Sequence, residues 1–315
     1  MRYGFGVDLG GTTVKLGFFA ENGKLVEKWE IPTRTENGGG QILPDIAASV
    51  KEYIHRIGVG EKNILGIGIG VPGSVRSDGT VNRCVNLGWG VFNIETKLEK
   101  LTGFPVKAGN DATLAALGEC WKGGGAGYSN IVFATLGTGV GGGVVINGNV
   151  IHGTHGAAGE IGHMVLNRNE TEVCSCGKRG CVEQYCSATG IVRMAKNYLS
   201  NTREPSSLRS VQILTCKDVF DAAAAKDACA QKILEQVYAY MGEFLANICD
   251  VVDPEAVVLG GGVSKAGMPL LEGVQRHFEK YVFHAVQPVR FTLATLGNDA
   301  GAYGAFKLIL DSKGE

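Results

Sequence analysis

The sequence predicts an α/β protein built from two domains. Strand-like apolar segments alternate with segments of helical periodicity, a pattern typical of this fold class. A strand, glycine turn and strand near the start recur in the middle of the chain. At 315 residues the chain is also long for a single hydrophobic core. We therefore predict a smaller first domain over residues 1–112 and a larger second domain over 113–299, with a C-terminal helix at about 300–315 that packs back on the first.

The first domain is expected to open with antiparallel strands. Residues 3–9 are apolar enough for a buried strand, and a glycine turn at 10–12 joins them to a partner over 13–19. A turn at 21–23 precedes a third strand over 24–31. Further along, the pattern predicts a helix over 42–57, strands over 64–71 and 104–108, and a helix from about 112 to 121.

The second domain is expected to repeat that opening. The stretch VFATLGTGVGGGVVI aligns with FGVDLGGTTVKLGFF, since each runs from an apolar strand through Leu-Gly and a Thr/Gly turn to a second apolar strand. We thus expect a strand over 130–136, a turn at 137–139 and a return strand over 142–146. The remaining expected elements are a long helix over about 228–249, strands over 256–259 and 290–294, and a closing helix over 302–310.

Composition and charge exclude several classes of function. Hydrophobic residues make up 44% and charged residues 19%, which fits a globular protein. The formal net charge of −1 gives no electrostatic basis for binding nucleic acid or an anionic membrane. The first residues lack the pattern of a secretion signal, and the nine cysteines are an odd number. We therefore expect a cytoplasmic protein with reduced thiols, some of which bind a metal.

Three glycine-rich turns follow apolar strands and suit a nucleotide. Glycine lets backbone N–H groups approach an anion because no Cβ stands in the way. Asp8, at the end of the first strand, could hold Mg²⁺ through water. For each turn alone an ordinary hairpin is an equal alternative, and the context supports neither a Rossmann nor a P-loop motif. The candidate cofactor-binding residues are Asp8, Gly10, Gly11, Thr12, Thr13, Gly137, Thr138, Gly139, Gly260, Gly261 and Gly262.

Asp111 is the candidate catalytic base. It follows Asn110 where an apolar strand gives way to a helix, and from there its carboxylate could accept a proton from a substrate hydroxyl. In phosphoryl transfer such a base mostly orients the alcohol, because the transition state is loose. The alternative is that these residues merely cap the helix, and the two interpretations are compatible.

A histidine and three cysteines form a candidate metal site. His163 and the run Cys174-x-Cys176-x₄-Cys181 have the composition of a closed structural Zn²⁺ site. Four protein ligands leave no position for a metal-bound water, so the zinc would act by fixing the His163 ring and the loop that carries Glu183. The alternatives are three free thiols or a nucleic-acid zinc finger. The lack of basic charge and of a second paired half argues against the finger.

Four motifs, taken together and in this order, resemble those of the ROK family (repressors, open reading frames and sugar kinases). They are DLGGTTVK at 8–15, LGTGVGGG at 136–143, GTHGAAGEIGH at 153–163 and CSCGKRGCVE at 174–183. The resemblance extends over nearly the whole chain. The last two motifs are highly specific, whereas the glycine turns are shared with the wider actin/hexokinase-like superfamily.

The resemblance implies a fold and a set of site residues. The fold would be a two-domain actin/hexokinase-like (ribonuclease-H-like) fold with a cleft between the domains. Asp111 would be the catalytic base, the turns at 10–13 and 137–139 would bind the phosphates, and 260–262 would lie beside the adenosine. Segments 72–73 and 86–89 match parts of the family near the sugar pocket. The sugar would be bound by Asn110, Asp111, Glu160, His163 and Glu183, and zinc by His163, Cys174, Cys176 and Cys181.

The activity implied by the resemblance is that of a cytosolic sugar kinase. It would transfer the γ-phosphoryl group of ATP to the 6-hydroxyl of glucose, with Mg²⁺ neutralising charge on the phosphates. The alternatives are an N-acetylmannosamine kinase, a polyphosphate-using glucose kinase and, outside the enzymes, a sugar-sensing regulator. Regulators of the family carry an added N-terminal helix-turn-helix, and this sequence begins at the first strand, which favours the enzyme. The family also leads us to expect a homodimer or a dimer of dimers.

Overall fold

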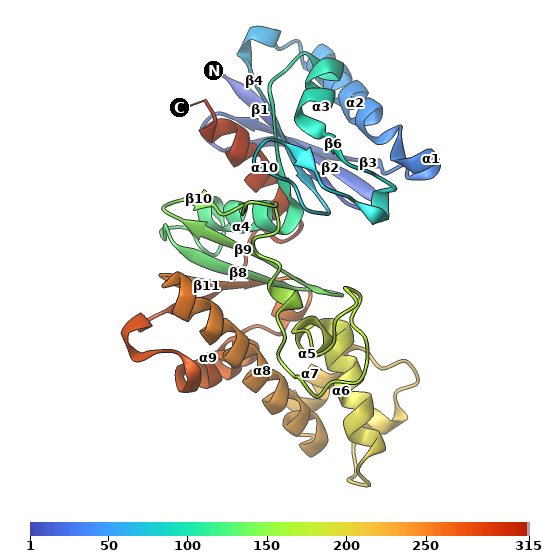
Figure 1. Cartoon of the computed structure of the whole chain (residues 1–315), viewed down its shortest axis with the longest axis vertical. Coiled ribbons are helices and arrows are strands. Elements are labelled where there is room, and N and C mark those ends of the chain that lie inside the picture. Colours follow the sequence, from blue (N-terminus) through green and yellow to red (C-terminus); the bar gives the residue numbers. More distant parts are fainter. Residues whose placement is uncertain (314–315) are drawn as a thin grey trace. The chain divides into compact units, whose positions relative to one another are not determined.

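The computed structural model describes residues 1–313, which form two compact units (Figure 1). Unit 1 comprises Met1–Ser129, Gly143–Gly159 and the chain from Leu296 onward. Unit 2 comprises Asn130–Gly142 and Glu160–Thr295. The chain forms two five-stranded sheets, with helices packed against each.

The sheet of unit 1 is mixed and has the strand order β3-β2-β1-β4-β7. β1 pairs antiparallel with β2 and parallel with β4, which confirms the hairpin predicted at the start of the chain. The last strand begins two residues later than predicted, because Pro105 has no N–H to donate to the ladder. The strands are β1 (Tyr3–Leu9), β2 (Thr13–Ala20), β3 (Leu25–Pro32), β4 (Ile64–Val71) and β7 (Val106–Asn110).

One face of this sheet carries glycines, and helix α10 (Ala300–Asp311) lies directly on it (Figure 1). A Cβ on Gly6 of β1 would overlap the carbonyl of Ala302, and a Cβ on Gly68 of β4 would overlap that of Ala305. Helix α4 (Asp111–Lys122) packs against α10 in the same layer. The glycines therefore let the helix backbone approach the sheet closely.

The other face of the sheet holds the main core of unit 1. Because successive side chains of a strand point to opposite faces, Phe5 and Val7 alternate with the glycines of β1. They share a buried cluster with Ile46 and Val50 of α2 (Ile42–Ile57). The smaller elements of unit 1 are α1 (Glu36–Gly39), β5 (Thr80–Val81), β6 (Phe92–Asn93), α3 (Ile94–Thr102) and β10 (Asn149–Val150).

Unit 2 is built around three parallel strands and a long helix. β11 pairs with β8 on one side and β12 on the other, in the second five-stranded sheet, whose order is β10-β9-β8-β11-β12. The long helix α8 buries Val237, Met241 and Leu245 in the core of this unit, and α9 packs against it (Figure 1). The elements are β8 (Ile131–Leu136), β9 (Val140–Ile146), α5 (Glu183–Cys186), α6 (Ala188–Ser200), α7 (Cys216–Ala224), α8 (Ala228–Val252), β11 (Ala256–Gly260), α9 (Met268–Tyr281) and β12 (Arg290–Leu293).

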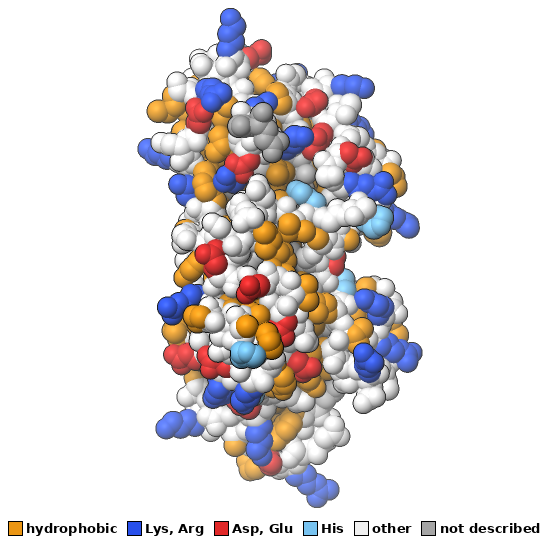
Figure 2. Space-filling view, turned by 60° about the vertical axis from the view of Figure 1, so that its left-hand side comes forward, with side chains coloured by type: hydrophobic (Ala, Val, Ile, Leu, Met, Phe, Trp, Pro, Cys, Tyr) orange, Lys and Arg blue, Asp and Glu red, His pale blue; other side chains and the backbone are white. Residues whose placement is uncertain are grey.

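The charges on the surface of the protein agree with the near-neutral net charge of the sequence. Lys and Arg side chains are mixed with Asp and Glu over much of the face shown in Figure 2, in keeping with the net charge of −1. Over residues 1–313, no helix combines the length and the hydropathy that crossing a membrane requires. The nine cysteines all carry free thiols.

Candidate functional site

Asp111 stands where strand β7 passes into helix α4 in unit 1. β7 ends at Asn110 and α4 begins at Asp111. The Oδ1 atom of Asn110 accepts the N–H of Thr113 at 3.0 Å, so Asn110 is the helix cap. The capping interpretation is confirmed for Asn110, and the role of Asp111 as a base stays a prediction.

The carboxylate of Asp111 is held by short-range hydrogen bonds. Its Oδ1 accepts the side-chain amide of Asn110 at 3.0 Å and the backbone N–H of Ala112 at 2.8 Å. The same amide of Asn110 donates to the carbonyl of Gly73 at 3.2 Å. Asn110 therefore links the candidate base to the 72–73 turn, a segment that the family resemblance places near the sugar pocket.

Asp8 and the first glycine turn lie together at the end of β1. The N–H of Gly10 donates to the carbonyl of Thr13 at 3.0 Å and closes the turn, and the hydroxyl of Thr33 donates to Gly10 at 2.8 Å. Burial raises the pKa of Asp8, although Lys15 at 3.6 Å opposes this effect. A cation bound near the Asp8 carboxylate would offset the free-energy cost of burying its negative charge.

The second glycine turn, at residues 137–139, joins β8 to β9 in unit 2. The N–H of Gly137 donates to the carbonyl of Gly139 at 2.9 Å. Two donors at the start of α6 hold the turn from one side: the N–H of Ala188 reaches the carbonyl of Gly137, and the hydroxyl of Thr189 that of Thr138, each at 2.8 Å. The turn is thus attached to a helix nearly fifty residues further along the chain.

The third glycine turn lies against the end of β8, next to the second. β11 ends at Gly260, and Gly261 has a φ of +82°, which favours glycine. A Cβ at Gly261 would come within 2.5 Å of the carbonyl oxygen of Leu136, the residue before the second turn. Unit 2 therefore brings two of the predicted nucleotide-binding turns side by side.

The four predicted metal ligands meet in one cluster of unit 2. The candidate ligand atoms of His163, Cys174, Cys176 and Cys181 all lie within 4.8 Å of one another. The Sγ atoms of Cys176 and Cys181 are 3.6 Å apart, and Cys174 Sγ lies 3.8 Å from His163 Nδ1. A tetrahedral Zn²⁺ with bonds of about 2.3 Å to sulfur separates its ligands by about 3.8 Å. The donor set and its spacing therefore fit zinc.

The backbone around the cluster is tightly folded. Between His163 and Glu183 it forms turns and two isolated bridges, and a Cβ on Gly180 would overlap the carbonyl of Asn167. Burial, helped by the neighbouring Cys176 thiol, raises the pKa of Cys181 to about 12. A bound dication would reverse that effect, because it binds the thiolate and displaces the thiol proton.

Glu183 connects the metal cluster with the second glycine turn. It is the first residue of α5, two positions after Cys181. Its Oε2 accepts the N–H of Val140 at 3.1 Å, and its Oε1 accepts the hydroxyl of Ser175 at 2.9 Å. The other acidic candidate, Glu160, is exposed and lies just before the short 3-10 helix Ile161–His163.

A second network ties the metal-binding segment to α6. Arg193 forms an ion pair with Glu170 at 2.7 Å, and the hydroxyl of Tyr185 donates to the same carboxylate at 2.5 Å. The guanidinium of Arg193 also lies over the Tyr185 ring, 5.1 Å from its centroid. The hydrogen bond from Arg193 holds the pKa of Glu170 at about 2, against the effect of burial and with help from Tyr185.

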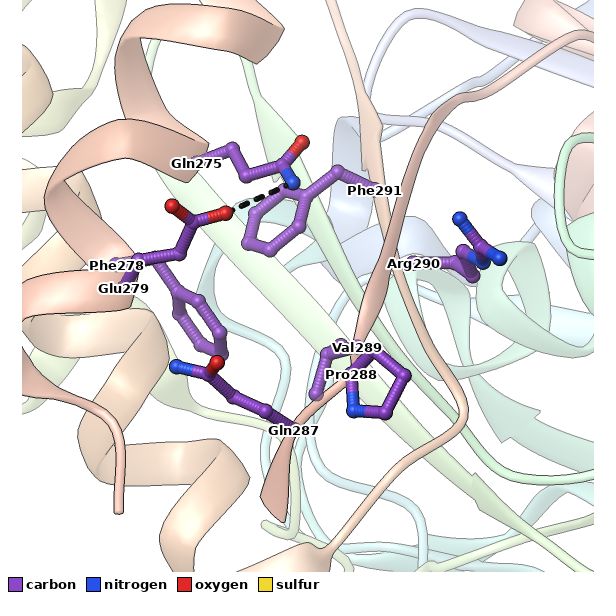
Figure 3. Close-up of a pocket in the computed structure, with 8 residues that line it drawn as sticks. All are labelled: Gln275, Phe278, Glu279, Gln287, Pro288, Val289, Arg290 and Phe291. Carbon is purple, nitrogen blue, oxygen red and sulfur yellow. Dashed lines mark hydrogen bonds between the residues drawn. The ribbon is translucent and has the colours of Figure 1, made fainter. Parts of the chain in front are cut away.

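A pocket lies between α9 and β12 in unit 2. It has a volume of about 180 Å³ and contains the rings of Phe278 and Phe291, with Gln275 donating to Glu279 at its edge (Figure 3). None of the candidate site residues lines it. Its composition gives no reason to assign it a role in phosphoryl transfer.

Sequence reasoning missed the hydroxyl groups that connect these parts. Ser175 lies between two predicted ligands, and Ser187 caps α6 through the N–H of Gly190. The capping role of Ser187 could have been predicted from the sequence, because serine is a preferred residue at the N-cap of a helix. The contact of Thr189 with Thr138 joins residues 51 positions apart and has no local signal.

Comparison with known proteins places the chain among sugar kinases. It is 44% identical to the glucokinase of Halalkalibacterium halodurans over 98% of this chain and 95% of that protein. It is 35% identical to the glucokinase of Thermotoga maritima over 98% of each. Its structure resembles a ROK family glucokinase of Streptomyces griseus solved with glucose and AMPPNP, with a TM-score of 0.76, 31% identity, and 97% and 98% of the two chains covered.

These likenesses confirm the α/β actin/hexokinase-like fold predicted from the sequence. The family match extends over residues 4–312, which is nearly the whole chain, and the protein therefore belongs to the ROK family.

Proposed function

We propose that this protein catalyses the ATP-dependent phosphorylation of glucose at its 6-hydroxyl. The observation that carries the proposal is the 44% identity to a glucokinase over 98% of the chain. A second support is the likeness to a ROK family glucokinase that was solved with glucose and AMPPNP, at 31% identity. The reaction transfers the γ-phosphoryl group of ATP to the sugar oxygen and moves the hydroxyl proton to a base.

In this proposal unit 1 supplies the base. Asp111 accepts the proton of the 6-hydroxyl and aims that oxygen at phosphorus, and Asn110 and the N–H of Ala112 hold its carboxylate. Because the transition state of phosphoryl transfer is loose, positioning contributes more than the strength of the base. Asp8 and the turn at 10–13 would hold Mg²⁺ and phosphate, and Mg²⁺ would neutralise charge that builds up on the transferring group.

In this proposal unit 2 supplies the sugar-binding groups and the second phosphate turn. Glu160, Glu183 and His163 would accept or donate hydrogen bonds to the sugar hydroxyls. Each hydrogen bond to a charged group contributes about 1.5–3 kcal/mol, so hydroxyl stereochemistry would decide which sugars react. The turns at 137–139 and 260–262 would bind the phosphates and the adenosine.

The metal cluster has a structural role in this proposal. Three thiolates and one imidazole occupy all four positions of a tetrahedral Zn²⁺, so the metal would hold the loop and the His163 ring. Cys174 approaches His163 through Nδ1, which would leave Nε2 to contact a sugar hydroxyl.

The proposal is tested by an ADP-release assay on the purified protein with a panel of hexoses. Glucose with ATP should give the highest kcat/KM, above mannose, N-acetylmannosamine and N-acetylglucosamine, and polyphosphate should replace ATP poorly. The product should be identified as the 6-phosphate by NMR. A preference for an N-acetylated sugar, or turnover with none, would contradict the proposal.

We also infer that the protein works in the cytoplasm, supported by its nine free thiols. The homodimer or dimer of dimers expected from the family stays a prediction. Sedimentation velocity over a range of concentrations would check it.

A further inference from the structure

The glycine turn at 137–139 is held by two separate sets of contacts within unit 2. One set comes from the start of α6, and the other from Glu183 beside the metal cluster. We propose that Thr189 and Ser175 are positioning residues, which set the shape of this turn for nucleotide phosphate and make nucleotide affinity depend on the metal. The inference rests on the proposed function, because it takes the phosphates of ATP as the ligand of the turn.

The contacts from α6 orient two successive peptide groups. Ala188 and Thr189 donate to the carbonyl oxygens of Gly137 and Thr138, each at 2.8 Å. In a trans peptide group the C=O and the following N–H point in opposite directions. The N–H groups of Thr138 and Gly139 must therefore point away from α6. Successive N–H groups aimed at one side make a site for an anion.

The contacts from Glu183 fix the exit of the turn. Its Oε2 accepts the N–H of Val140 at 3.1 Å, and a Cβ on Gly139 would overlap the same oxygen. The carboxylate thus occupies the space beside Gly139 that any side chain would need. This gives a physical reason for glycine at 139, and it makes the position of Val140 depend on that of Glu183.

Ser175 and Ser187 connect these contacts to the metal cluster. Ser175 lies between two of the cysteines, and its hydroxyl donates to Glu183 Oε1 at 2.9 Å. The hydroxyl of Ser187 donates to the backbone carbonyl of Glu183 at 2.6 Å and lies 3.0 Å from that of Thr189. A continuous path of hydrogen bonds therefore runs from the cluster to both sides of the turn. Loss of the metal should loosen the turn even when no sugar is bound.

The inference is tested first with Thr189→Val and Thr189→Ser in the full-length protein. Thr189 is exposed, and valine keeps its shape without the hydroxyl, so the fold should be kept. Calorimetric titration with AMPPNP and Mg²⁺, without sugar, should show affinity about five- to tenfold lower for Thr189→Val, the loss expected for one hydrogen bond. Thr189→Ser should restore affinity to within about twofold, and glucose affinity should change in neither variant.

The second test addresses the metal. Ser175→Ala should keep its zinc, measured by mass spectrometry, yet bind AMPPNP several-fold more weakly, because Glu183 loses a donor. Chelation of zinc from the wild type should weaken AMPPNP binding at least as much. Unchanged AMPPNP affinity in Thr189→Val would overturn the inference, and continued phosphorylation of glucose by the wild type would then leave the proposed function intact. A wild type that bound no AMPPNP and phosphorylated no sugar would overturn both.

Discussion

The two phosphate-turn candidates have similar sequences and are supported in different ways. The turn at 10–13 is closed by its own backbone and by the hydroxyl of Thr33, just beyond the end of β3, and a Cβ on Gly11 would meet open space. The turn at 137–139 is held on one side by α6 and on the other by Glu183. The turn at 10–13 is thus held by contacts within its own sheet. The conformation of the turn at 137–139 depends on α6 and Glu183, which lie far along the chain.

The same contrast separates the remaining site residues of the two units. In unit 1, Asp8 and Asp111 stand at the ends of strands, and the sheet ladder and the helix cap fix them. In unit 2, His163 and Glu183 bracket a segment of turns, which the cluster of cysteines holds together. The site residues of unit 1 are thus positioned by secondary structure, and those of unit 2 by the candidate metal cluster. The contrast predicts that metal removal affects unit 2 and leaves unit 1 unchanged.

The largest expected effect comes from the base in unit 1. Asp111→Asn should lower kcat by about 10²–10⁴-fold, the range typical of a lost general base. Because the helix cap is Asn110, the melting temperature and the zinc content should stay near those of the wild type. Asp45→Asn, which neutralises a half-buried carboxylate of α2 that pairs with Arg34 in the same unit, is the matched control and should keep full activity. Near-normal turnover in Asp111→Asn would remove the assignment of the base.

The next effect comes from the metal cluster in unit 2. Cys176→Ser should lose zinc and raise the KM for glucose about tenfold or more, because the zinc would hold the His163 ring that contacts the sugar, and support of a binding group in this way contributes about 10- to 100-fold. The proton NMR resonances of unit 1 side chains that pack against its core, such as Trp29, should keep their chemical shifts if only unit 2 depends on the metal.

The control for this variant is Cys216→Ser, which changes a half-buried cysteine outside the cluster. It should keep both zinc and glucose affinity. A wild-type protein that contains no zinc after expression with the metal present would contradict the assignment of the cluster.

Asn110 offers a smaller and more selective effect. Asn110→Ala removes a helix cap, which costs about 1 kcal/mol of stability, and also the amide that holds Asp111 and Gly73. We expect kcat to fall about tenfold, beyond what the lost cap explains. Asn93 caps α3 in the same way through the N–H of Thr96, so Asn93→Ala should lose similar stability and keep kcat. Equal kcat in the two variants would show that Asn110 acts only as a cap.

The smallest effect at neutral pH is expected from Glu170 in unit 2. Its pKa is held at about 2, below the ordinary value of 4.5, so its charge stabilises the fold above about pH 4.5 and this contribution is lost as pH falls toward 2. Glu170→Gln should flatten the curve of unfolding free energy against pH between those values, in urea titrations followed by circular dichroism. Glu204→Gln, at an exposed ion pair with Lys232 that also lowers the pKa of Glu204, should flatten the curve much less, because solvent screens the exposed pair. An unchanged curve in Glu170→Gln would contradict the role of the network.

Regular elements with a strong periodic pattern were predictable from the sequence. The helix over 42–57 and the strand over 64–71 match α2 and β4 at both ends, because apolar residues mark their inner faces throughout. The predicted strand at 104–108 was wrong by two residues, because a proline stands second in that run. Helix α9 was missed although Leu270, Val274 and Phe278 recur at helical spacing.

The site was predictable where its residues are close in the chain. The spacing of Cys174, Cys176 and Cys181 indicated a cluster, and the structure brings them together with His163. The contacts of Thr189 and Glu183 with the second turn were not predictable, because they join segments about 40 to 50 residues apart through single hydrogen bonds. Only the folding of unit 2 as a whole decides where such partners lie.

The close packing of α10 on the glycines of β1 and β4 has a consequence for biosynthesis. β1 is synthesised before the segments of unit 2, whereas α10, which covers the bare face of its sheet, is synthesised after them. The sheet of unit 1 therefore stays uncovered while unit 2 is being made, and unit 1 can complete its fold only when α10 has been added. A chain released between unit 2 and α10 would have an open sheet face, which is the kind of surface that chaperones bind.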